Sequence, residues 1–248
     1  MVYLTQEEWN NYFVPKLFED NEVFNNELKF IKNIFSIMKT INSNPLILST
    51  SMIYFRECCC YLTFNNILNF NLSPIDKLII SGSCIFIATK STNHLISVSF
   101  IINKIKEILI KKLPNLNIEK ETIKQLIFEK EFEILKSIEF CANVELPYKF
   151  ILKLKNYFQK NINISSDILI KCCCQYINDS FFFPFSLYYT SNIISISIVK
   201  IMKEKFNLVD INLNDVIYLS EYKIDINELN ECFLLLQKFF DKLKTQNN

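Results

Sequence analysis

The segment LIISGSCIFIATK, from Leu78 to Lys90, and the segment NIISISIVKIMKE, from Asn192 to Glu204, decide the fold of this chain. In both segments small residues stand inside a stretch that is otherwise apolar at helical spacing. Small side chains let neighbouring helix backbones approach closely, so each segment suits the central helix of a bundle. Because the two segments are alike, we expect that one helical unit has been duplicated.

The residues before the two segments support the duplication. Each segment follows a helical stretch with a similarly placed tyrosine, Tyr54 in the first case and Tyr176 in the second. An alternative stays open at this point: two unrelated apolar helices can look alike in a chain that is rich in isoleucine and serine.

The rest of the chain is also typical of helices. Apolar residues recur at helical spacing, and Pro45, Pro74, Pro114 and Pro147 interrupt the pattern. The chain has a single glycine, so it offers little of the turn chemistry that β-hairpins need. We therefore expect an all-α fold, with an N-terminal helix near Gln6–Phe13 and further helices near 23–40, 45–61, 74–90, 95–112, 119–139, 147–159, 166–181, 191–206, 212–219 and 225–244.

Composition excludes several classes of function. The chain has 248 residues, with 27 basic and 26 acidic side chains and a net charge of +1, so we expect no direct binding to nucleic acid. The start MVYLTQEEW is unlike a signal peptide, and no apolar run reaches the roughly 18 residues of a membrane helix. These observations predict a protein of the nucleus or cytoplasm without a membrane partner.

The cysteines do not predict a metal site or an enzyme. Six of the nine lie in two triplets, Cys58–Cys60 and Cys172–Cys174, and the only histidine is His94. Successive residues of a helix point about 100° apart, so a triplet cannot converge on one ion. We expect reduced cysteines that pack as small apolar residues, with no metal, no cofactor and no catalytic residue.

Three stretches resemble the cyclin family. The first, Leu48–Lys90, is similar to the second and third helices of a first cyclin box, with its "VYFxRFY" and "LLAxACLFLASK" patterns. The second, Phe128–Leu154, resembles the fifth helix and the linker, and the third, Cys172–Val199, resembles the "NDSxxTxLxLxYPPxxIAxACI" part of a second box. The resemblance implies two consecutive five-helix cyclin-box bundles with flanking helices: residues 1–21 as an N-terminal helical extension, 22–143 as the first box, and 144–248 as the second box with a C-terminal helix.

The resemblance implies a regulatory subunit that binds and activates a cyclin-dependent kinase. The Asn178-Asp179 pair and the opening YLTQEEW are most like transcription-associated cyclins of types C, K, L and T, which implies a role in transcription or RNA processing in the nucleus. The chain departs from the family at Glu57, which replaces an arginine or aromatic residue, and after Lys90, where "KxEE" is usual.

Other functions stay open as alternatives. One is a cell-cycle cyclin, and another is a transcription factor of the TFIIB type, although the basic face and zinc ribbon typical of the latter are missing. A helical hydrolase or prenyl-transfer enzyme would need clustered aspartates or a Cys/His arrangement, which the sequence lacks.

Two charges stand where the periodicity expects apolar residues. Glu131 falls on the stripe formed by Ile123, Ile127, Leu135 and Ile138, and Lys90 ends an apolar helix face. Such charges need each other, or the backbone groups of another protein, as partners. The resemblance places Lys90 and Glu131 at the kinase interface, with Leu135 and Phe128 as apolar neighbours. The alternative is that Lys90 is a solvated helix end and Glu131 a surface residue.

Overall fold

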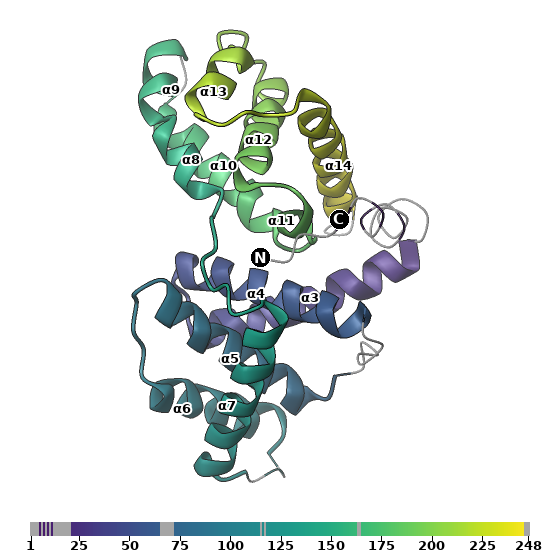
Figure 1. The fold of residues 1–248 in the computed structure, drawn as a ribbon, viewed down its shortest axis with the longest axis vertical. Helices are drawn as coiled ribbons and strands as arrows, with labels where there is room; N and C mark the ends of the chain where they lie inside the picture. Colours follow the sequence, from purple (N-terminus) through teal and green to yellow (C-terminus); the bar gives the residue numbers. More distant parts are fainter. Residues whose placement is uncertain are drawn as a thin grey trace. The chain divides into compact units, whose positions relative to one another are not determined.

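The computed structural model describes residues 5, 7, 9, 11, 21–64, 72–114, 116, 118–162 and 165–245. Twelve helices, labelled α3 to α14 in Figure 1, and no strand occur in these residues, which confirms the predicted all-α fold. The chain forms two compact units, one containing Asp20–Val144 and the other Glu145–Asn248. The predicted limits of the extension and of the two boxes stay predictions, and most of the helix predicted near Gln6–Phe13 lies outside the described residues.

The first unit is built around one helix. Its five helices are α3 (Asn21–Ile41), α4 (Pro45–Phe64), α5 (Pro74–Ser91), α6 (Val98–Lys112) and α7 (Lys120–Ser137). The central helix is α5, which contacts the other four (Figure 1). It begins at a capping box, in which Ser73 and Asp76 each bond to the other's backbone N–H, and Pro74 takes the first helical position. From Leu78 to Thr89 it is buried except at Phe86.

Small residues explain how α5 fits among its neighbours. A Cβ atom on Gly82 would lie 2.6 Å from Cδ1 of Ile105 and 3.3 Å from Cγ2 of Ile101, both on α6. On the side that faces α7, the buried hydroxyl of Ser83 lies 3.0 Å from the carbonyl oxygen of Ile127 and 2.9 Å from that of Ile79 in its own helix. The small side chains that the sequence places in this segment therefore allow the close approach of α6 and α7.

The second unit repeats this plan. Its helices are α8 (Tyr148–Lys153), α9 (Lys155–Asn161), α10 (Ser166–Ser180), α11 (Phe185–Tyr188), α12 (Ser191–Lys205), α13 (Leu213–Leu219) and α14 (Ile226–Thr245). The central helix is α12, which contacts α8, α10, α11, α13 and α14. Aligning the two central segments places Ser197 opposite Ser83, and the Ser197 hydroxyl lies 3.4 Å from the carbonyl oxygen of Leu229 on the last helix. The two aligned serines thus make equivalent contacts with a neighbouring helix. This favours a duplicated unit over a chance similarity between two apolar helices.

Two details of the second unit differ from the periodicity. The predicted helix 147–159 is divided at Leu154 into α8 and α9, and the one-turn helix α11 was not predicted. Trp9 is fully buried in this unit, where its ring stacks on Tyr188 with centroids 5.0 Å apart and an interplanar angle of 2°. The indole therefore packs among the aromatic side chains of the second unit.

The described residues contain neither a membrane-spanning helix nor a cluster of metal ligands. No helix there is long and apolar enough to cross a membrane. The same residues bring no three histidine, cysteine or acidic side chains together as metal ligands would be. Cys58 and Cys173 are buried, and burial raises the pKa of the Cys58 thiol to about 11, so this thiol stays protonated at neutral pH.

A buried carboxyl group sits in the core of the first unit. Glu57 on α4 is 4% exposed, and neither of its carboxyl oxygens has a hydrogen-bond partner among the described residues. Burial raises the pKa of Glu57 to about 7. In the unfolded chain this group ionises at about pH 4.3, so the folded protein holds the proton across the interval between the two values.

We therefore predict that the protein loses stability as pH rises from about 5 to about 8, by on the order of 3 kcal/mol from this group. The Glu57→Gln variant should gain free energy of unfolding over the wild type at pH 8 and not at pH 4.5, as measured by urea unfolding. The matched control is Glu204→Gln, which makes the same substitution at an exposed position of α12. An equal effect of Glu57→Gln at both pH values would show that the carboxyl group is not buried as a proton-binding group.

We also predict that Gly82→Leu destabilises the first unit, because its side chain would press on Ile105 and Ile101. Overpacking of a filled core typically costs about 1–3 kcal/mol, and this should appear as a lower melting temperature by circular dichroism. The control is Ser99→Leu, at an exposed position of α6, which should melt within about 0.5 kcal/mol of the wild type. An unchanged melt for Gly82→Leu would mean that α5 and α6 are not in close contact.

Candidate functional site

Lys90 and Glu131 meet on the surface of the first unit. Lys90 lies in the last turn of α5 and Glu131 in the middle of α7, and Nζ of Lys90 is 2.5 Å from Oε1 of Glu131. The lysine side chain is 47% exposed and the glutamate side chain 14%. The two charges that sequence periodicity singled out are therefore brought together, with the glutamate as the more enclosed partner.

The core residues of α7 explain the position of Glu131. Ile123, Ile127, Ile134 and Ile138 are buried, whereas Leu135 is only half-buried. The buried stripe therefore passes through Ile134. Leu135, which the sequence analysis placed on the stripe, lies at its edge. Glu131 lies on the same edge, where its carboxylate can reach the end of α5.

A buried tyrosine sets the end of α5 against the segment that follows α7. The hydroxyl oxygen of Tyr54 on α4 lies 2.8 Å from Oγ of Ser91 and 2.6 Å from the carbonyl oxygen of Ala142. Burial raises the pKa of Tyr54 to about 12, so the phenol keeps its proton for these contacts. Because Ser91 directly follows Lys90, this contact holds the C-terminal end of α5, and the Ser83–Ile127 contact joins the middle of α5 to α7.

Exposed phenylalanines surround the ion pair. Nζ of Lys90 lies 3.8 Å from the ring centroid of Phe86, whose ring is 5.9 Å from that of Phe128. Phe132 and Phe140 form a second ring pair, 6.3 Å between centroids. Phe128, Phe132 and Phe140 are 41%, 53% and 59% exposed. We call this set the α5–α7 surface: Phe86, Lys90, Phe128, Glu131, Phe132, Leu135 and Phe140.

Phe140 is held outward by an unusual backbone. After α7 ends, Glu139 and Phe140 adopt φ values of 49° and 57°, in the left-handed region that glycine or asparagine usually fills at a helix end. The N–H of Phe140 bonds to the carbonyl oxygen of Leu135 at 2.8 Å, which closes the turn. A bulky side chain in this conformation is costly, so its place on the surface points to a role outside folding.

Sequence reasoning named four members of this surface and missed three. Lys90, Phe128, Glu131 and Leu135 were named, and the structure brings them to one face of the first unit. Phe86, Phe132 and Phe140 were missed. Phe132 follows Phe128 by four residues, a spacing that already places both on one side of a helix. Phe140 depends on the turn after α7, for which the sequence has no glycine or asparagine signal.

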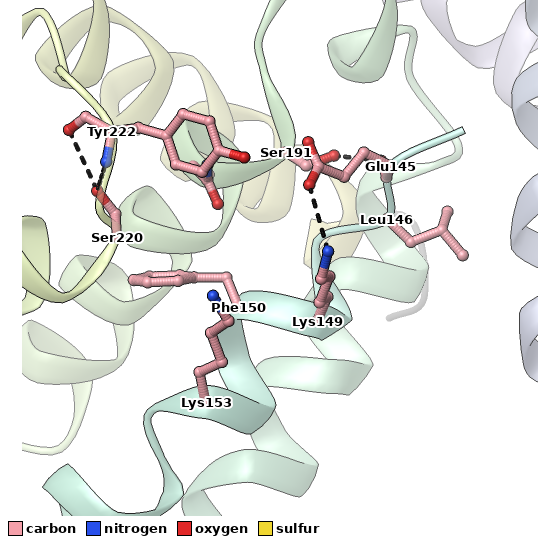
Figure 2. Close-up of a pocket in the computed structure, with 9 residues that line it drawn as sticks. Glu145, Leu146, Lys149, Phe150, Lys153, Ser191, Ser220 and Tyr222 are labelled. Carbon is pink, nitrogen blue, oxygen red and sulfur yellow. Dashed lines mark hydrogen bonds and ion pairs between the residues drawn. The ribbon is translucent and has the colours of Figure 1, made fainter. Parts of the chain in front are cut away.

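A small hollow in the second unit has a different character (Figure 2). Phe150 and Tyr222 line it together with Lys149 and Lys153, whose charges lie 3.9 Å from Glu145 and 3.8 Å from Glu221. Each lysine therefore has a carboxylate beside it. Ser191 donates to the carbonyl oxygen of Glu145 across the same hollow. Because both lysine charges are balanced by carboxylates, we interpret the hollow as a packing contact between α8, α12 and the segment after α13.

Comparison with solved structures identifies the fold. A chain of the yeast TFIIK (Kin28/Ccl1/Tfb3) complex matches with a TM-score of 0.62 and 19% identity, over 95% of this chain and 96% of that one. A chain of the yeast RNA Pol II CTD kinase CTDK-1 complex matches with a TM-score of 0.70 and 14% identity, over 98% and 75%. A chain of the Chaetomium thermophilum CAK complex bound to ATP-gamma-S matches with a TM-score of 0.52 and 11% identity, over 86% and 62%.

No protein-family model matches the sequence, and no curated protein matches it significantly. The likeness to the solved structures therefore lies in the fold. Two helical units, each around a central helix with small residues, define the class: the chain has the cyclin fold.

We predict that removing one charge of the pair disturbs the protein more than removing both. Lys90→Ala leaves the enclosed carboxylate of Glu131 without its donor, a loss of about 1–3 kcal/mol, whereas Lys90→Ala with Glu131→Ala should stay within about 1 kcal/mol of the wild type. The measurement is urea unfolding of both variants.

The control pair is Lys124 and Glu121, both on α7, with Nζ and Oε1 2.9 Å apart and the glutamate side chain 79% exposed. There the single Lys124→Ala and the double alanine variant should both lie within about 0.5 kcal/mol of the wild type. A Lys90/Glu131 double variant that is less stable than the single one would show that the pair is structural.

Proposed function

We propose that the chain is a cyclin, a regulatory subunit that binds and activates a cyclin-dependent protein kinase in transcription or RNA processing. The observation that carries the proposal is the α5–α7 surface: an ion pair and exposed phenylalanines on a chain with the cyclin fold. The fold neighbours support it, because they belong to cyclin–kinase complexes, among them the RNA Pol II CTD kinase CTDK-1. The motifs quoted above for transcription-associated cyclins support the same role.

The chemistry of the surface suits the binding of a protein helix. Phe128, Phe132 and Phe140 offer apolar area that a free chain leaves in water, and its burial would drive association. The Lys90 ammonium and Glu131 carboxylate can exchange part of their mutual contact for hydrogen bonds to a partner's backbone. The half-buried side chain of Leu135 would add to the apolar area that contacts the partner.

Activation follows from the rigidity of this surface. A kinase needs its mobile catalytic helix in place so that its lysine and glutamate pair, and the cyclin would bind that active arrangement more tightly than the inactive one. The contacts of Tyr54 and Ser83 hold α5 and α7 in position before the kinase arrives. On this proposal ATP and magnesium belong to the kinase, the cyclin performs no catalysis itself, and the complex works in the nucleus.

The test is binding of the kinase that copurifies with the tagged protein from its native cells, identified by mass spectrometry. Lys90→Ala with Glu131→Ala should weaken that binding by about 2–5 kcal/mol, a loss of tens- to thousands-fold, and lower kinase activity in proportion. The Lys124→Ala with Glu121→Ala variant removes the same two types of charge, here both from α7, and should bind normally.

Two results would contradict the proposal. If no kinase copurifies, the chain is not a cyclin in function. If a kinase copurifies and the Lys90/Glu131 variant, shown by its melt to be folded, binds and activates it normally, then the α5–α7 surface is not the interface.

A further inference from the structure

A groove opens on the first unit where three segments meet. The end of α3 supplies Lys39 and Ile41, the loop between α5 and α6 supplies Leu95 and Ile96, and the first turns of α6 supply Phe100 and Lys104. The groove measures about 570 Å³, within the range of roughly 300–1,000 Å³ that binding pockets occupy. It shares no residue with the α5–α7 surface.

The groove has an apolar wall that the fold itself does not use. Leu95 is 82% exposed and Phe100 is 43% exposed. Leu95 lies in the short loop before Ser97, the N-cap of α6 that accepts a hydrogen bond from the N–H of Phe100. The cap holds the loop and the first turn of the helix together, so the two exposed side chains keep their places in the groove.

The charge of the groove has one sign. Among the described residues that line it, Lys39 and Lys104 carry charge and none is acidic. Lys104 has Glu107 at 2.9 Å on its own helix, a partly exposed pair of the kind that contributes little. For Lys39, the described part of the chain contains no ion pair or side-chain hydrogen bond. A ligand that brings negative charge would therefore meet two cations beside an apolar wall.

We propose that this groove binds a short segment of another protein in which bulky apolar side chains are flanked by acidic residues. The apolar side chains would cover Leu95 and Phe100, and the acidic ones would pair with Lys39 and Lys104. Nucleic acid fits less well, because two lysines are few for a phosphate backbone and the wall is apolar. The groove is a second interaction surface beside the one proposed for the kinase.

The experiment is fluorescence anisotropy of the full chain with three fluorescein-labelled peptides. DDLFDD carries both features, KKLFKK reverses the charge, and DDSSDD removes the apolar side chains. We expect binding of DDLFDD alone. Lys39→Glu with Lys104→Glu should weaken DDLFDD by at least about tenfold and create binding to KKLFKK, because the charge complementarity is inverted. Leu95→Ser should also weaken DDLFDD, and at 82% exposure it should leave the melt unchanged.

Matched controls separate the groove from general effects. Lys111→Glu changes an exposed lysine of α6 outside the groove, and Leu234→Ser changes a leucine of the second unit that is 58% exposed. Both should bind DDLFDD normally. So should Lys90→Ala with Glu131→Ala, which makes the result independent of the kinase proposal.

Two outcomes would overturn the inference. One is that DDLFDD does not bind, or that the Lys39→Glu with Lys104→Glu variant does not prefer KKLFKK over DDLFDD. The other is that sedimentation shows a dimer which Leu95→Ser converts to a monomer, since the occupant would then be a second copy of this chain.

Discussion

The close approach of α5 to its neighbours is the constraint on which the first unit depends. Gly82 leaves no room for a Cβ beside Ile105, and Ser83 places its hydroxyl 3.0 Å from the backbone of α7. Two helices at this distance bring the end of α5 within reach of the outer edge of α7. The pairing of Lys90 with Glu131 is therefore a consequence of small residues two turns away. Side chains of ordinary size at those positions would separate the charges before any partner could use them.

The duplicated unit shows which part of this arrangement belongs to folding. Ser197 repeats the contact of Ser83, with Leu229 in the place of Ile127. Carrying that alignment along the helices puts Glu204 where the first unit has Lys90, and the buried Phe233 where it has Glu131. The serine contact is kept and the ion pair is not. A bundle of this plan can therefore fold without the pair, which separates the packing device from the charges that stand on it.

The sequence could predict the features that periodicity controls. The main helices, the central segments and the apolar stripe of α7 apart from Leu135 follow helical spacing, and Glu131 stood out because it interrupts that spacing. Features that depend on the path of a loop could not be predicted. The outward Phe140 requires positive φ at two residues without glycine, and the exposure of Leu95 requires the particular loop before Ser97. The break at Leu154 also lacks a signal, because no proline or glycine stands there.

The α5–α7 surface lowers the stability of the free chain, which suggests that it is kept for binding. A left-handed backbone at a residue other than glycine costs roughly 1–2 kcal/mol, and here two successive residues adopt it so that a phenylalanine can stand 59% exposed. The neighbouring ion pair adds little in return, since half-exposed pairs contribute about 0–1 kcal/mol. Folding alone would favour a glycine at position 140 and apolar packing at position 131. A sequence that keeps strain, exposed rings and an enclosed charge on one face is better explained by what that face binds than by the stability of the chain.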